Sequence, residues 1–452
     1  MPFSEVTFAS SNCKKMKKTK LYVAITLVLT QTISWAQDTI VISKKEIINK
    51  AADKNLQIKI ADQSFKAAQA DYRQSNALFL PSITASHTGI STTNPLMAFG
   101  SKLNQEILTQ ADFNPALLNN PARTQNFATK IEILQPLINI DGYYGRQAAK
   151  AKMEAFQFQT ERTKEYLELE INKAYMQLQL AYKAVTVLNK ANTTALSNLQ
   201  VVNNYFKQGM LQKTDVLTVE VRVNEIKNQL QYAKSNVQNA SDYLAFLINE
   251  DLSNSVFKPL EALENSINTI TTNPLLSGDR KDLLAMDQSV KAYEKMAQSS
   301  QMNFLPRLNA FGSYELYDKN ILGMGASGYL VGAQLSWNVF DGYKSIGKME
   351  KAKAEHQKSS IENQQYKAQS QIELNKTNRQ LKDSENKVGL AQLALQQSEE
   401  AYRIRNNRFQ QGLEKTSDLL QAATQMSQKE LELLQAVFEY NITKEYLQFL
   451  TK

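Results

Sequence analysis

Several short stretches of this chain alternate between apolar and polar residues. The clearest is 329–339, where apolar side chains occupy every second position: Tyr329, Val331, Ala333, Leu335, Trp337 and Val339. Residues 307–317 alternate similarly, and shorter alternating stretches lie at 83–85 and 129–133. Alternation over about 10 residues is typical of a half-buried soluble sheet and also of an outer-membrane β-barrel. The pattern predicts four strands, at about 81–90, 127–137, 306–317 and 328–340.

A second pattern has a period of seven residues. Its apolar positions in the second half of the chain are Leu374, Leu381, Val388, Leu395, Tyr402 and Phe409. The positions 203 residues earlier form the same line, with one polar interruption at Asn192, and proline is absent from both regions. Such stretches favour helices that supercoil with their neighbours. The sequence therefore predicts two long helices and two return helices, at about 141–208, 212–249, 341–410 and 414–451.

The second long helix carries only one narrow apolar line. Its partner seam positions are largely Asn, Ser, Glu, Gln and Thr, whereas a dry two-stranded coiled coil needs a second apolar seam. A single line suits helices that touch their neighbours sideways around a water-filled tube. An exposed structural coiled coil is the alternative, and the predicted strands argue against it.

Two similar segments lie about 200 residues apart, "YFKQGMLQKTDVL" at 205–217 and "RFQQGLEKTSDLL" at 408–420. A Leu-Pro pair before the first strand and an Asp-Gly-Tyr triplet after the second also occur in both halves. Several matches in the same order indicate an internal duplication. We divide the chain into a leader (1–36), a first repeat (37–250), a linker or belt (251–278) and a second repeat (279–452).

The first 36 residues have the features of a signal peptide. A basic stretch precedes the apolar run 21–30, and small residues precede a predicted cleavage between Ala36 and Gln37. The apolar run is too short to serve as a membrane-anchor helix. Five lysines and one glutamate lie in this leader, so the net charge of +8 falls to +4 for the remainder, which does not indicate a nucleic-acid partner.

Residues that could support catalysis or metal binding are sparse. The only cysteine, Cys13, lies in the predicted leader, and the two histidines, His87 and His356, have no neighbouring ligand pattern. Glycine-rich phosphate loops and nucleophile motifs are missing from the sequence. We therefore predict a protein that is not an enzyme and that needs no cofactor or metal.

Taken together, these features resemble TolC-type outer-membrane efflux proteins over essentially the whole of residues 37–452. The resemblance rests on the doubled helix–strand–strand–long helix–helix unit, on the Leu-Pro and Asp-Gly-Tyr boundaries, and on the repeated hairpin turn. It implies a homotrimer in which a twelve-stranded β-barrel in the outer-membrane lipid continues into a periplasmic α-helical barrel. It also implies a periplasmic adaptor (membrane fusion) protein as partner, with an inner-membrane pump joined through it. Residues 94–124 resemble the long first-hairpin loop of some family members.

In this family the repeated turns lie at the periplasmic mouth. From the residues alone, Gly209 and Gly412 suit left-handed turn positions. The helix-starting roles fall to Thr214, Asp215 and Thr416, with Asp418 beside them. The resemblance places the entrance constriction at Asp418, Gln421, Glu414 and Lys415. It places the adaptor contact at the tips 205–216 and 408–419, which include Phe206 and Phe409.

Two of these positions differ from the pattern expected for the family. Gln421 stands where an aspartate is expected, and Glu414 stands where a basic residue is expected. Because both changes alter the charges at the constriction, we expect a weaker or differently wired gate.

Two functions remain open. The first is a passive outer-membrane exit channel of a tripartite efflux or type I secretion system. The second is a soluble periplasmic coiled-coil scaffold or adaptor that forms no pore. The alternating strands favour the channel, because a scaffold has no need of two such hairpins. The transported substrate is not encoded in any motif.

Overall fold

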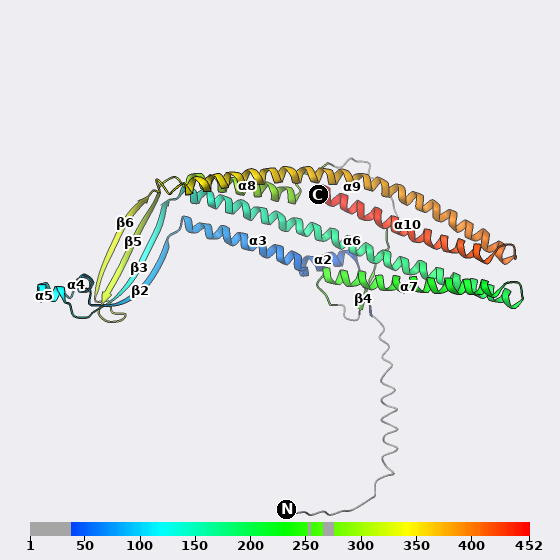
Figure 1. Cartoon of the computed structure of the whole chain (residues 1–452), viewed down its shortest axis with the longest axis horizontal. Coiled ribbons are helices and arrows are strands. Elements are labelled where there is room, and N and C mark those ends of the chain that lie inside the picture. Colours follow the sequence, from blue (N-terminus) through cyan, green and yellow to red (C-terminus); the bar gives the residue numbers. More distant parts are fainter. Residues whose placement is uncertain (1–37, 252–254, 265–274) are drawn as a thin grey trace, which may run out of the picture.

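The computed structural model describes residues 38–251, 255–264 and 275–452. The predicted leader and its cleavage site at Ala36 and Gln37 lie outside these residues. The molecule is elongated, with long helices over most of its length and a four-stranded sheet at one end (Figure 1). One order of elements occurs twice, as α3–β2–β3–α6–α7 and as α8–β5–β6–α9–α10.

The longest helices contain 68 and 67 residues. At about 1.5 Å per residue each is roughly 100 Å long. The first half of the chain contains α2 (Lys44–Lys54), α3 (Leu56–Gln74), α6 (Ile140–Lys207) and α7 (Lys213–Leu247). The second half contains α8 (Lys281–Met302), α9 (Lys344–Gln410) and α10 (Thr416–Thr451).

The large sheet is antiparallel, in the order β2–β3–β5–β6. Its strands are β2 (Ser82–Thr92), β3 (Thr124–Ile138), β5 (Arg307–Asp318) and β6 (Ala326–Ser336). β2 and β6 each have one neighbour in this sheet, so the sheet has two open edges. Open edges cannot persist in lipid, where backbone groups find no water.

The two faces of this sheet differ sharply in polarity. Residues paired directly across strands share a face, and one such row consists of Ala85, Ile131, Tyr314 and Tyr329. The adjacent row, on the opposite face, consists of Ser86, Lys130, Glu315 and Gly328. Lys130 pairs there with Glu315 at 3.5 Å. The apolar face is exposed, with Tyr329 retaining 82% of its accessible surface.

Proline residues end or disturb two of the strands, and one of these ends differs from the sequence prediction. The last strand was expected to reach 340, but β6 ends at Ser336, which pairs with Arg307. The residue before Arg307 is Pro306, which has no N–H to continue the ladder, so Trp337 and Val339 lie beyond the strand. A register shift follows Pro136 in β3, for the same reason.

The segment 94–124 was expected to be a loop, but it contains the helices α4 (Pro95–Asn104) and α5 (Pro115–Asn119). Two Asn-Pro pairs of this segment start the two helices. Asn94 and Asn114 are N-caps, and each is followed by a proline at the first helical position. Asparagine at the N-cap with proline next is a favoured helix start.

The seven-residue line of α9 packs inward. Leu374, Leu381 and Val388 lie in one buried cluster with residues of α10, and Phe409 lies in another at the tips. α8 lies beside α6 and α9 on the half nearer the sheet, and α7 and α10 lie on the half nearer the tips (Figure 1). The helices therefore form a layer that extends the sheet.

A small parallel sheet was not predicted from the sequence. β1 (Asp38–Ile42) pairs with β4 (Ser255–Pro259). Of the two strands, only β4 lies inside the predicted linker 251–278. The Tyr175 hydroxyl on α6 donates to the Ile42 carbonyl oxygen at 3.1 Å and anchors this sheet to the long helix.

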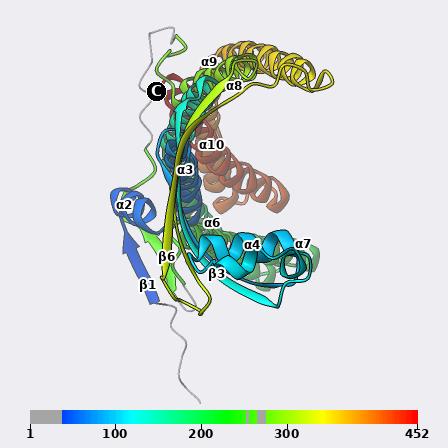
Figure 2. The same cartoon turned by 90° about the vertical axis from the view of Figure 1, so that its left-hand side faces the viewer.

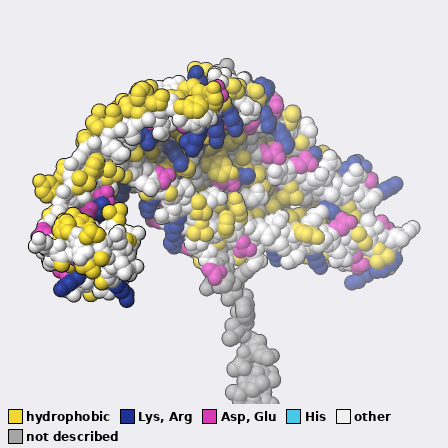
Figure 3. Space-filling model, turned by 60° about the vertical axis from the view of Figure 1, so that its left-hand side comes forward, with side chains coloured by type: hydrophobic (Ala, Val, Ile, Leu, Met, Phe, Trp, Pro, Cys, Tyr) yellow, Lys and Arg dark blue, Asp and Glu magenta, His cyan; other side chains and the backbone are white. Residues whose placement is uncertain are grey.

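The molecule is curved across its long axis. Seen along that axis, the helices and the sheet form an arch, and α4 projects toward its hollow side (Figure 2). Lysine and arginine side chains gather beneath the arch, while hydrophobic side chains run along its outer side (Figure 3). An arch with a polar inner side is the shape expected of one segment of a tube.

Candidate functional site

The two helical hairpins end in turns of the same geometry. Gly209 and Gly412 adopt positive φ angles of 74° and 73°, a region that glycine enters without steric cost. Met210 N donates to the Tyr205 carbonyl at 2.9 Å, and Leu413 N donates to that of Arg408 at 2.9 Å. These are the helix-ending bonds of a Schellman-type turn.

The helix-starting residues differ from the prediction. The N-caps are Gln212 and Lys415, so Thr214 and Thr416 lie within the first turns of α7 and α10. Asp215 is the third residue of α7, and its carboxylate accepts from Gln212 N at 3.1 Å. The acid therefore caps from inside the helix, because it can reach back to the free N–H of the N-cap.

The two tips pack against each other. Val202, Val216, Phe409, Leu419 and other residues form a buried cluster between the hairpins. The Tyr205 hydroxyl donates to the Gln410 carbonyl at 3.0 Å. These contacts bind the end of α6 to the end of α9.

A charged cluster, consisting of Arg405, Arg408, Glu414 and Asp418, surrounds the second tip. The Glu414 carboxylate accepts from Arg405 Nη1 at 2.9 Å and from Arg408 Nε at 2.8 Å. Arg405 Nη1 also lies 3.7 Å from Asp418 Oδ2. The Glu414 side chain retains only 12% of its accessible surface. The cluster fastens the end of α9 to the start of α10 within one chain.

The predicted constriction residues are therefore only partly brought together. Glu414 and Asp418 share Arg405, whereas Lys415 and Gln421 are exposed at the same tip. Sequence reasoning missed the two arginines. The available signal was their place in the last turns of α9, where cations are favoured near the helix C-terminus.

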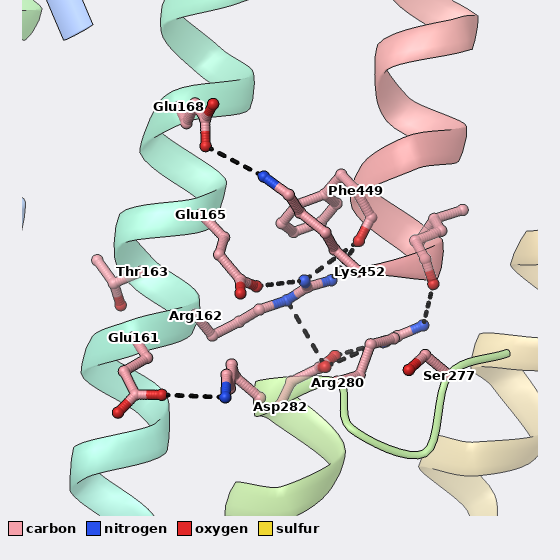
Figure 4. Close-up of polar contacts among 12 residues, drawn as sticks. Glu161, Arg162, Thr163, Glu165, Glu168, Ser277, Arg280, Asp282, Phe449 and Lys452 are labelled. Carbon is pink, nitrogen blue, oxygen red and sulfur yellow. Dashed lines mark hydrogen bonds and ion pairs between the residues drawn. The ribbon is translucent and has the colours of Figure 1, made fainter.

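A second polar cluster joins four helices midway along the molecule (Figure 4). We call Arg162, Arg280, Asp282 and Tyr366 the junction cluster. Arg280 is 2% exposed and forms an ion pair with Asp282. Arg162 lies 3.6 Å from Asp282, and the Tyr366 hydroxyl donates to it at 2.6 Å. The cluster was not predicted, because Arg162 and Tyr366 lie far in sequence from the Arg280–Asp282 pair.

The junction cluster also holds the end of α10. Both terminal nitrogens of Arg162 donate to the Phe449 carbonyl at 3.2 Å, and its guanidinium lies 3.5 Å from the centre of the Phe449 ring. Arg280 Nη1 donates to the Leu450 carbonyl at 3.4 Å. Burial raises the pKa of Asp282, but hydrogen bonds from Arg280 and Tyr366 and the charge of Arg162 outweigh it and lower that pKa to about 2.

The family of the chain follows from a comparison with known protein families. A sequence model described as "Outer membrane efflux protein" matches residues 47–250 and 275–451. The chain belongs to this family of outer membrane efflux proteins. None of the curated proteins compared by sequence matches it.

Several solved membrane proteins, among them the CmeC outer membrane channel, share the fold of this family member. VceC from Vibrio cholerae is 15% identical, with a TM-score of 0.76 over 90% of this chain and 96% of VceC. CmeC from Campylobacter jejuni is 16% identical, with a TM-score of 0.77 over 90% of this chain and 85% of CmeC. A membrane protein from Pseudomonas aeruginosa is 16% identical, with a TM-score of 0.78 over 93% and 95% of the two chains.

Within residues 38–251, 255–264 and 275–452, no helix is long and apolar enough to cross a membrane. In the same ranges, no group of three or more His, Cys, Asp or Glu side chains is placed to hold a metal ion.

Proposed function

We propose that this protein is a passive exit channel that conducts substrates from the periplasm, across the outer membrane, to the outside. The observation that carries the proposal is the division of the sheet into an exposed apolar face and a polar face. An apolar face turned to lipid and a polar face turned to water are what an outer-membrane barrel strand requires. A scaffold working in water gains nothing from an exposed row containing Ile131, Tyr314 and Tyr329.

The channel would be a homotrimer. Four strands with two open edges cannot close a barrel, and pairing β2 of one copy with β6 of the next would remove both edges. Three copies would supply twelve strands, and the arched helical layers would complete a tube below them. The repeated order of elements supports an origin by duplication, which gives each copy two similar hairpins.

The narrow entrance would lie at the helical tips. The glycine turns and the packed tip cluster close one end of each helical hairpin, and Asp418 from three copies would face a common axis. Like charges gathered around one axis repel each other and favour cations over anions. Glu414 is engaged with Arg405 and Arg408 in its own chain, so the proposed gate is held partly by contacts within each copy.

Transport energy would come from other proteins. We assign the protein no enzymatic activity, because the family to which it belongs is one of outer membrane efflux proteins. We propose that a periplasmic adaptor binds the tips 205–216 and 408–419 and joins the channel to an inner-membrane pump. Such an assembly would serve tripartite efflux or type I secretion.

The decisive experiment is a measurement of location and assembly. Cells expressing the protein are fractionated, the outer membrane is extracted in mild detergent, and the oligomeric mass is determined. A trimer in the outer-membrane fraction that forms channels in a planar bilayer is the expected result. A water-soluble monomer or dimer in the periplasmic fraction would overturn the channel and support the scaffold.

A further inference from the structure

The helix α4 packs against the far end of the sheet. Two residues of α4 are buried, Ala98 at 1% exposure and Ser101 at 5%. Gln105, which directly follows the helix, is also buried, at 5% exposure. Gln105 Nε2 donates to the Gln125 carbonyl and to Asn126 Oδ1, both at 2.8 Å. These contacts hold α4 in a defined place on β3.

The face of the sheet that α4 covers is the polar one. Asn126 lies four residues before Lys130 in β3, and side chains an even number of residues apart share a face of a strand. Lys130 belongs to the polar row with Glu315. Figure 2 shows α4 projecting toward the hollow side of the arch, in agreement with this assignment.

The opposite side of α4 carries leucines. At about 100° per residue, positions 98, 101 and 105 share one side of a helix, and positions 96 and 103 lie about 180° from it. Leu96 and Leu103 are 81% and 56% exposed. Since α4 rests on the inner face of the sheet, these two side chains point away from the wall and toward the hollow.

The α4 segment is folded and locally neutral. Phe99 packs edge-on against Phe113, with ring centres 5.6 Å apart. Lys102, the single charged residue of α4, pairs with Asp112 at 2.7 Å. Hydrogen bonds from Lys102 and Thr109 lower the pKa of Asp112 to about 2, so this carboxylate stays charged. Copies of α4 could therefore approach one another without charge repulsion.

We infer that the α4 helices of three copies converge inside the outer mouth, where Leu96 and Leu103 form an apolar constriction. This inference rests on the proposed trimeric channel. Each chain supplies one such helix, because the other hairpin has only the short turn 319–325. In the trimer, the exposed leucine face of each α4 would contact the same face of α4 in the other two copies. Lipid would lie against the opposite, apolar face of the sheet.

An apolar ring of this kind acts as a barrier to ions. Narrow hydrophobic constrictions close by losing their water, so they resist ion flow without any charged gate. The channel would then have two barriers, one at the helical tips and one at the outer mouth. The second barrier would be set by the first hairpin loop alone.

Conductance in planar bilayers tests the barrier. Two variants of the whole protein are compared with the wild type: Leu96→Ser with Leu103→Ser, and replacement of 95–119 by a short Gly-Ser linker. Both should raise single-channel conductance, by about twofold or more for the replacement. The control is Leu117→Ser, an exposed leucine of α5 in the same loop. Unchanged conductance in both variants would overturn the barrier.

Crosslinking tests the convergence itself. The only cysteine of the sequence is Cys13, in the predicted leader, so Leu96→Cys would introduce the sole thiol of the mature chain. Oxidation in isolated outer membranes should give a disulfide-linked dimer for Leu96→Cys and none for Ile133→Cys, on the lipid-facing side of β3. A Leu96→Cys variant that stays uncrosslinked in a trimeric channel would overturn the convergence. A wild type that neither trimerises nor conducts would overturn the proposed function instead.

Discussion

The Glu414 carboxylate and the Arg408 guanidinium form an ion pair across the turn between α9 and α10, with 2.8 Å between Oε2 and Nε. Arg405 approaches the same carboxylate from one turn earlier in α9. The Glu414 carboxylate therefore pairs with two arginine side chains at the proposed entrance. It also accounts for the glutamate that stands where relatives are expected to carry a basic residue.

Glu414→Gln should loosen the entrance. The substitution leaves Arg405 and Arg408 without their shared carboxylate, and a partly exposed network of this kind stabilises by about 1 kcal/mol. A loss of that size would raise the open fraction about fivefold, measured as open probability in planar bilayers. Glu400→Gln is the matched control, since Glu400 pairs with Arg403 on the exposed surface of the same helix. Equal open probabilities for the two variants would contradict the role of Glu414.

Asp418→Asn should reduce the preference for cations. Three carboxylates would be lost around the axis, so the reversal potential in a salt gradient should move toward zero. Asp215→Asn serves as the comparison, because Asp215 occupies the corresponding place in the first hairpin and caps α7. An unchanged reversal potential for Asp418→Asn would restrict this residue to a local structural role.

Tyr205→Phe should weaken the link between the two tips. It removes one hydrogen bond, to the Gln410 carbonyl, while it keeps the ring against Phe409. A bond of this type contributes about 1 kcal/mol, so channel opening should become several-fold more frequent. Tyr232→Phe, at an exposed tyrosine of α7, should have no effect. If the two variants behave alike, the hydrogen bond does not restrain the tips.

Asp282→Asn should destabilise the helical layer. It leaves the buried Arg280 without its counter-charge, at a cost of about 3 kcal/mol near neutral pH. The folded-state pKa of Asp282, about 2, lies below its ordinary value of 3.8. The wild type therefore holds this stabilisation above about pH 4 and loses it as the pH falls toward 2.

Thermal unfolding in detergent at several pH values measures this effect. The gap in Tm between the wild type and Asp282→Asn should be largest at neutral pH and should shrink below about pH 4. Asp287→Asn is the control, because Asp287 lies on the same helix as Asp282 and forms an exposed ion pair with Lys367 of α9. A gap that stays constant from pH 7 to pH 3 would contradict the proposed pairing.

The helices and strands were accessible to sequence reasoning because each has its own local pattern. The seven-residue line from Leu374 to Phe409 is buried along α9 except at the partly buried Tyr402, since a regular apolar period needs a neighbour to cover it. The alternation around Tyr329 corresponds to the two faces of the sheet. Both patterns depend only on the backbone period.

The remaining features depend on contacts that no local pattern records. The Arg280 ion pair with Asp282 becomes a junction only when α6, α9 and α10 meet it, and those residues are distant in sequence. The pairing of β1 with β4 joins two five-residue stretches more than 200 residues apart. The helices within 94–124 were not predicted because an Asn-Pro pair suits both a turn and a helix start. The packing of α4 on β3 decided between the two.

The junction cluster lies far from the tips along α6. About 45 residues of α6 separate Arg162 from the tip, which corresponds to a rigid arm of roughly 70 Å. Because the junction cluster joins four helices at one level, we expect any bending that accompanies opening of the proposed entrance to occur on its tip side. A tilt of about 5° near the junction cluster would displace the end of such an arm by roughly 6 Å. Small angular changes of the helices near the junction cluster would thus become large displacements at the proposed entrance.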